Sequence, residues 1–235
     1  MKKLALEILK EGFFVLKSRD GGILILINFI FFLIFGLVTL ISGILILGPA
    51  AMLLKDPHVV SGVLVFFLLL LFIEVVVLFV VFEQFIILTC LYRIYEHHAP
   101  IFTLTLFQEE KERFLLYIKS CLTVLVKICI GLILFILPGL RAFFRFLFIG
   151  PISIFEYQGQ LTADETLKRS ENLTEPHFWL LVLGGILFIV ILFLSHLILG
   201  QLLTQLVLMP VLATYLTICI VILYRRESRR PELNR

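Results

Sequence analysis

The sequence predicts an all-α, polytopic membrane protein with about six transmembrane helices and amphipathic helices on the cytoplasmic side. Six strongly apolar stretches are separated by short charged segments, and the first runs from Gly21 to Leu54 without a charge. Of the 235 residues, 61% are hydrophobic and 16% are charged, whereas roughly a quarter of the residues in soluble domains are charged. Because about 20 apolar residues cross the hydrocarbon core as a helix, spans and connections use up nearly the whole chain.

The chain is expected to form a single integral membrane domain over residues 1–235. An amphipathic helix is expected at 2–18, and spans near 22–47, 60–82, 115–137, 140–157, 178–200 and 202–224. The fourth span is short, because about 16 residues rise only about 24 Å. Pro151 also interrupts it. It either crosses fully or enters and leaves on one side.

Basic residues at both ends of the chain predict the orientation. They are Lys2, Lys3, Lys10, Lys17 and Arg19 before the first span, and Arg225, Arg226, Arg229, Arg230 and Arg235 after the last. Cytoplasmic segments carry an excess of Lys and Arg, so both termini are expected in the cytoplasm, which requires an even number of crossings. Charges at Glu7, Lys10 and Glu11 interrupt the apolar run that a cleaved secretory signal needs, so none is expected.

An amphipathic helix on the cytoplasmic side is expected before each pair of spans. In the first of these helices, polar and apolar residues fall on opposite sides: Lys3, Glu7, Lys10, Lys17 and Ser18 against Leu4, Ala5, Ile8, Leu9, Phe13 and Leu16. This pattern is typical of a helix that lies on the membrane surface. Capping boxes at Thr105–Gln108 and Thr162–Glu165 predict where the second and third helices start, and Asn172 is a candidate stop for the third.

Two ionisable residues lie inside apolar runs, Glu74 in the second span and Lys127 in the third. Insertion scales put the cost of such a group at about 2.5–3.5 kcal/mol, so it normally faces a partner or a wet cavity. Their expected depths differ by about 6 Å, which the Lys side chain can span. They are therefore a candidate intramembrane pair, which would either lock two helices together or serve a proton or ion relay.

No set of residues in the sequence has the spacing of a catalytic, metal or cofactor site. Ser195 and His196 are neighbours, and neighbours on a helix cannot face each other as a nucleophile and a base. The net charge of +3 is small and dispersed around the spans, which indicates orientation rather than nucleic-acid binding. The sequence therefore predicts a protein that is not an enzyme and binds no metal, cofactor or nucleic acid.

One region has a recognisable pattern, which begins with Leu137-Pro-Gly-Leu-Arg141 and runs through Phe146 to Glu156. Thr166-Leu-Lys-Arg-Ser170, Leu173-Thr174 and His177-Phe-Trp179 follow it. The region resembles the YciC-like bacterial inner-membrane proteins and the related membrane domain attached to some glycerophosphodiester phosphodiesterases. Their pattern is a Pro-Gly, an Arg-bearing span, a Glu, then Ala-Leu-Lys-Arg-Ser, a Leu-Thr and an aromatic pair; here Thr166 stands in place of the Ala.

The match covers about 45 residues, and the layout of the spans covers most of the chain. The resemblance implies six helices in a bacterial inner membrane and an association with lipid or envelope maintenance. It carries over no catalytic residues, because the phosphodiesterase chemistry belongs to a separate barrel domain for which this chain has no room.

Four basic residues of this region are candidates for binding lipid headgroups. Arg141 and Arg145 lie one helical turn apart near the expected outer interface, where guanidinium groups bind phosphate or an acid. Lys168 and Arg169 lie at the cytoplasmic boundary, which suits anionic lipid. The alternative for all four is ordinary interfacial anchoring.

The expected function is a non-enzymatic, multi-pass inner-membrane protein that binds membrane lipids or a partner protein, which includes a second copy of itself. A small transporter or channel that uses Glu74 and Lys127 is the alternative. A transporter normally has several convergent acids or paired broken helices inside the membrane, and the sequence offers little of either.

Overall fold

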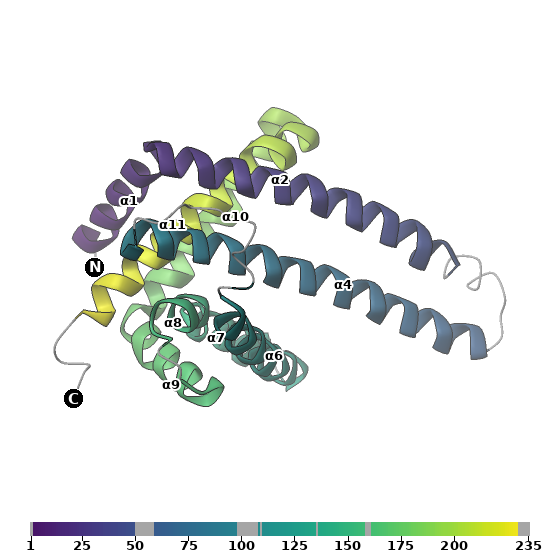
Figure 1. Cartoon of the computed structure of the whole chain (residues 1–235). Helices are drawn as coiled ribbons and strands as arrows, with labels where there is room; N and C mark the ends of the chain where they lie inside the picture. Colours follow the sequence, from purple (N-terminus) through teal and green to yellow (C-terminus); the bar gives the residue numbers. More distant parts are fainter. Residues whose placement is uncertain are drawn as a thin grey trace.

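The computed structural model describes residues 2–49, 59–97, 108, 110–134, 136–157 and 161–229, and every regular element in these ranges is helical (Figure 1). Four helices in the described residues are long and apolar enough to cross a membrane. This bears out the all-α class and the apolar, membrane-type helices. The predicted capping box at Thr105–Gln108 lies mostly outside the described residues.

Two helical hairpins contain these four helices. α2 (Arg19–Ser42) and α4 (Val59–Tyr92) form the first, which projects beyond the rest of the molecule in Figure 1. Phe side chains in tilted and edge-to-face contact join its two helices, with ring centroids 5.4–6.1 Å apart between Phe31 or Phe35 on α2 and Phe79 or Phe82 on α4. π-helical turns extend α2 and α4 as η1 (Gly43–Leu47) and η2 (Arg93–His97).

The second hairpin consists of α10 (Phe178–Leu203) and α11 (Met209–Ser228), which the π-helical turn η4 (Thr204–Leu208) joins. His177, directly before α10, lies 3.0 Å from Glu227 in the last turn of α11. The two helices therefore start and finish at the same end of the molecule.

The third and fourth predicted spans are not among the four apolar helices. The third corresponds to α6 (Lys111–Leu134), which carries Lys119 and Lys127 along its length. α6 crosses α4 steeply, so that it is foreshortened in Figure 1 where α4 is not. The fourth is divided into α7 (Ile136–Arg145) and α8 (Ile149–Phe155), because the chain turns at 146–148.

Two further helices lie where the sequence predicts amphipathic ones. α1 (Lys2–Lys17) packs against α2 and α11, and α9 (Ala163–Thr174) packs against α6 and α8. The predicted capping box of α9 is confirmed: the Glu165 N–H donates to the Thr162 hydroxyl, and the Glu165 carboxylate accepts from the Thr162 N–H. Asn172 does not stop this helix, because the 3₁₀ turn η3 (Glu175–His177) continues it into α10.

The apolar core lies where α4, α8 and α11 meet. Phe85, Phe148 and Ile218 are fully buried there, together with much of the stretch from Phe85 to Tyr92. Gly150 allows α8 to lie close against α4, since a Cβ at this position would lie 2.5 Å from Leu88 Cδ1. The outer halves of α2 and α4 and most of α10 instead expose apolar side chains, as expected where a helix faces lipid.

Candidate functional site: the charged end of the bundle

Ion pairs connect the ends of the helices at one end of the molecule, which we call the charged end. Arg226 of α11 lies 3.1 Å from Glu7 and 2.7 Å from Glu11 of α1. Its neighbour Arg225 lies 3.0 Å from Glu96 in the turn after α4. Since α2 starts directly after α1, the charged end contains one end of each of the four apolar helices.

Glu156, just after α8, connects α8, α9 and α11. Its carboxylate accepts a 2.6 Å hydrogen bond from the Tyr224 hydroxyl and forms an ion pair with the Arg169 guanidinium. Tyr224 is 2% exposed and packs its ring against Phe148 and Phe155 of α8. A charge-assisted hydrogen bond to such a buried phenol ties the end of α11 to α8.

Arg145, the last residue of α7, belongs to the same network. Its guanidinium pairs with Glu171 of α9 and lies 3.3 Å from Glu175 of η3. Its backbone carbonyl accepts hydrogen bonds of 2.9 Å from the Ser170 hydroxyl and 2.8 Å from the Thr174 hydroxyl. The carbonyl at a helix end lacks an intrahelical partner, so these hydroxyls satisfy it and join α7 to α9.

This geometry changes the interpretation of two of the four headgroup candidates. Arg145 was expected near the outer interface, but it lies against α9, at the end where the last turn of α11 also lies. Arg145 and Arg169 each pair with carboxylates of the protein, because those acids lie within reach in the folded chain. Arg141 on α7 and Lys168 on α9 are exposed, so only these two keep a side chain directed to the surroundings.

His177 and Glu227 make a buried contact, with side chains that are 8% and 1% exposed. His177 Nε2 lies 3.0 Å from Glu227 Oε1. A carboxylate at this depth needs charged or polar neighbours, and His177 is one of them. The sequence pattern located His177 beside the aromatic pair but gave no sign of Glu227, which lies 50 positions later in the sequence.

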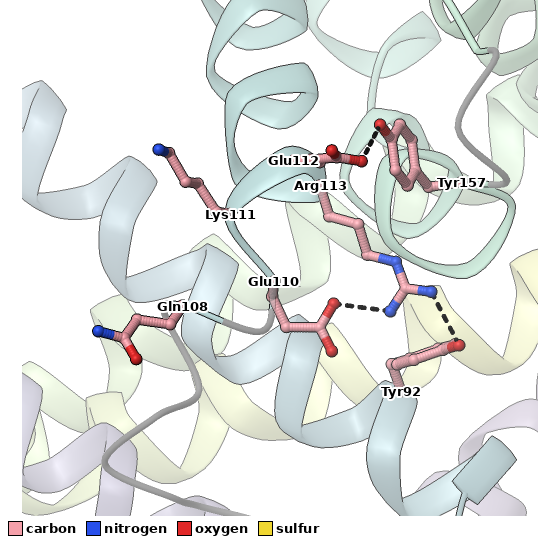
Figure 2. A pocket seen from close by; sticks show the side chains of 7 residues that line it. All are labelled: Tyr92, Gln108, Glu110, Lys111, Glu112, Arg113 and Tyr157. Atoms are coloured by element: carbon pink, nitrogen blue, oxygen red, sulfur yellow. Dashed lines mark hydrogen bonds and ion pairs between the residues drawn. The ribbon is translucent and has the colours of Figure 1, made fainter.

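An open hollow of about 560 Å³ lies beside α6 at the same end (Figure 2). Arg113 donates a 2.7 Å hydrogen bond to Glu110 and a 3.0 Å hydrogen bond to the Tyr92 hydroxyl, and it stacks over the Tyr92 ring. Across the hollow, the Tyr157 hydroxyl donates to Glu112 at 2.9 Å, and this bond raises the pKa of the phenol. Acidic and basic groups around the hollow therefore bind each other rather than converge on a central point.

Arginine and lysine have different roles in the described residues. The cations in the ion pairs of the charged end are all arginines: Arg93, Arg113, Arg145, Arg169, Arg225 and Arg226. The lysines whose burial is described are all exposed: Lys3, Lys10, Lys17, Lys111, Lys119, Lys127 and Lys168. The planar, weakly hydrated guanidinium suits partly buried pairs, whereas the strongly hydrated ammonium favours the surface.

The structure does not join Glu74 to Lys127. Both side chains are exposed, and no ion pair links them in the described part of the chain. The Lys127 ammonium instead lies 5.6 Å from the centre of the Phe146 ring, a cation–π contact. The reason is that α4 and α6 are in contact around Phe85 and diverge from there. Glu74 and Lys127 both lie away from this contact, so they are separated in space.

A buried polar contact between two of the apolar helices was not predicted. Asn28 of α2 is 1% exposed, and its amide donates hydrogen bonds of 2.8 Å to the Thr214 hydroxyl and 3.2 Å to the Pro210 carbonyl of α11. Only Asn28 itself, the single amide side chain in the apolar run of α2, could have signalled it. Glu83 of α4, also missed, is 9% exposed. It was placed outside the second span, whereas α4 continues to Tyr92.

No group of three or more His, Cys, Asp or Glu side chains in the described ranges could hold a metal ion. Comparison of the chain with protein-family profiles, with characterised proteins and with solved structures finds no match. The resemblance to the YciC-like family therefore depends on the residues quoted for it. Several of these residues meet in the structure, since Arg169, Ser170, Thr174 and His177 all lie at the charged end.

Proposed function

We propose that the protein is a non-enzymatic, multi-pass inner-membrane protein that binds lipid or a partner protein in maintenance of the cell envelope. The observation that carries the proposal is the charged end itself. Its acids and arginines bind one another and hold α1, the ends of the apolar helices and α6 to α9 in one folded surface. Such a surface beside a membrane presents a fixed shape for binding.

The proposed topology has four crossings, by α2, α4, α10 and α11, with α6 to α9 at the cytoplasmic face and both termini in the cytoplasm. Two features support it: the basic residues at both ends of the chain and the four helix ends gathered at the charged end. The six-span arrangement predicted from the sequence requires α6 and the broken segment of α7 and α8 to cross as well.

Reporter fusions distinguish the two topologies. A reporter after Leu134, at the end of α6, should be cytoplasmic with four crossings and periplasmic with six. Reporters after Lys55 and after Arg235 are the controls, and both topologies put them in opposite compartments. A periplasmic reporter after Leu134 would show that α6 crosses, and a shared compartment for the two controls would contradict both arrangements.

The binding function is tested by native mass spectrometry of the full chain, extracted in a mild detergent from its own membrane. We expect peaks that carry retained phospholipid, a second copy of the chain or another protein. If the spectrum shows only the bare chain, and the co-extracted lipids match the composition of the membrane, the proposal is wrong.

A small transporter or channel that uses Glu74 and Lys127 remains the alternative, and the geometry supports it less. An ion path needs polar groups that converge inside the membrane, whereas these two side chains are exposed and separate. The buried polar contact of Asn28 with α11 joins two helices through hydrogen bonds and holds no charge.

A further inference from the structure

We propose that α1 binds the headgroups of anionic phospholipids through a row of three lysines, Lys3, Lys10 and Lys17. This inference rests on the proposed function and names the ligand class and the site. The lysines recur every seven residues, so at 3.6 residues per turn they drift by only about 20° each and follow one line along the helix. All three are exposed, and none is held in an ion pair among the described residues.

One face of α1 is attached to α11. Ile8 is 6% exposed on this face, and a Cβ at Gly12 would lie 2.7 Å from Cys219 Sγ. The Tyr215 hydroxyl donates a 2.9 Å hydrogen bond to the Leu9 carbonyl. α1 is therefore docked as a helix on α11, and the face opposite to Ile8 and Gly12 is the one that carries the lysines.

The acidic residues of α1 do not cancel the charge of the lysine row. Glu7 and Glu11 both point to Arg226 of α11, at 3.1 Å and 2.7 Å. A single guanidinium thus engages both carboxylates, including that of Glu7, which lies one helical turn from Lys3 and from Lys10. The three lysines and Arg226 outnumber these two acids, so this surface keeps a net positive charge.

Apolar side chains border the lysine row on the exposed surface. Leu6 is 54%, Phe13 62% and Phe14 78% exposed, and Leu9 is 42% exposed. Exposed apolar side chains beside a row of lysines are the composition of helices that lie in the headgroup region of an anionic membrane. There the apolar groups enter the acyl boundary while the lysine stems extend to the phosphates.

The connection between α1 and α2 favours a lipid surface over a soluble acidic partner. Only Ser18 separates the two helices, and its hydroxyl accepts from the Gly21 N–H at 3.1 Å to cap α2. α2 is one of the four apolar helices, so α1 is held at the depth where α2 enters the membrane. An amphipathic helix fixed at that depth meets phospholipid headgroups first.

The test uses the full chain in nanodiscs that contain equal amounts of phosphatidylglycerol and phosphatidylethanolamine. The measured quantity is the ratio of the two lipids that stay bound in native mass spectra. A lysine near an anionic surface contributes about fivefold to association, so three contribute on the order of 100-fold. The Lys3→Gln/Lys10→Gln/Lys17→Gln variant should therefore lose at least about tenfold of the phosphatidylglycerol preference, and the same triple change to Arg should retain it.

The matched control is Lys111→Gln/Lys119→Gln/Arg229→Gln, which removes three exposed cations from α6 and from the residue after α11. The control should keep the preference of the wild type, and the thermal melting of both variants should stay close to it because all six side chains are at the surface. If both variants lose the phosphatidylglycerol preference equally, net charge alone attracts the lipid and α1 is not a specific site. If the α1 variant keeps the preference of the wild type, the proposed site on α1 is also wrong.

The outcome separates this inference from the proposed function. If the wild type and the α1 variant both prefer phosphatidylglycerol, the protein binds lipid as proposed, but α1 is not the binding site. If the wild type shows no preference and retains no lipid or partner, the site and the proposed function both fail.

Discussion

Tyr224→Phe removes one hydroxyl and leaves the ring packing of α11 on α8 in place. The hydroxyl donates at 2.6 Å to Glu156, and hydrogen bonds to charged groups contribute about 1.5–3 kcal/mol. We expect Tyr224→Phe to lower the free energy of unfolding by about 1.5 kcal/mol, the lower end of this range, because Glu156 is 17% exposed to solvent and keeps Arg169 as a partner. Arg169 is 41% exposed, so its ion pair with Glu156 contributes little to the stability of the fold.

A double-mutant cycle of Tyr224→Phe with Glu156→Gln measures this coupling. Unfolding in mixed micelles can be followed by the fluorescence of Trp179, the single tryptophan, in the first turn of α10. The expected coupling is at least about 1 kcal/mol. Tyr215→Phe with Glu156→Gln is the control, since Tyr215 is also on α11 but bonds to Leu9, and its coupling should stay within about 0.5 kcal/mol. If both cycles give the same coupling, the Glu156 connection is wrong.

Two further changes test the packing. Glu74→Gln and Lys127→Met should destabilise additively in thermal melts, because the two residues do not meet; a coupling above about 0.5 kcal/mol would show that they do. Gly21→Ala should cost about 2 kcal/mol or more, because the added Cβ would lie 2.2 Å from the Val15 carbonyl oxygen, which cannot move aside without shifting α1. Its neighbour Gly22 has nothing within 4 Å, so Gly22→Ala should be neutral or slightly stabilising, and equal melting of the two variants would contradict the tight turn.

The apolar helices could be predicted from the sequence, because burial in a bilayer depends on composition over about 20 residues. α2, α4, α10 and α11 all fall on predicted spans. The capping box at Thr162 was also predictable, because its partner is three residues away. These predictions, which depend on local composition or on residues close in sequence, were therefore confirmed by the structure.

Contacts between helices were harder to predict from the sequence. The third predicted span is not confirmed: α6 has an apolar C-terminal half, but it is not among the four apolar helices found in the described residues. Pairing of Glu74 with Lys127 followed from depth alone, and depth says nothing of the crossing angle between two helices. The contact of Asn28 with Thr214 spans 186 positions, a distance at which the sequence carries no pairing signal.

The charged end shows the same limit for single residues. From the sequence, Arg145 and Arg141 are equally good candidates for binding a lipid headgroup, since both are arginines on one helix face. What separates them is the position of Glu171 and Glu175, which the fold brings to Arg145. Once the acids of the protein have bound its arginines, the cations left to meet the membrane are those with no carboxylate nearby. On α1 these are lysines, and their strong hydration suits the headgroup region, where water and phosphate can both reach the ammonium. The ion pairs that hold the helices together therefore also decide which charges remain for lipid.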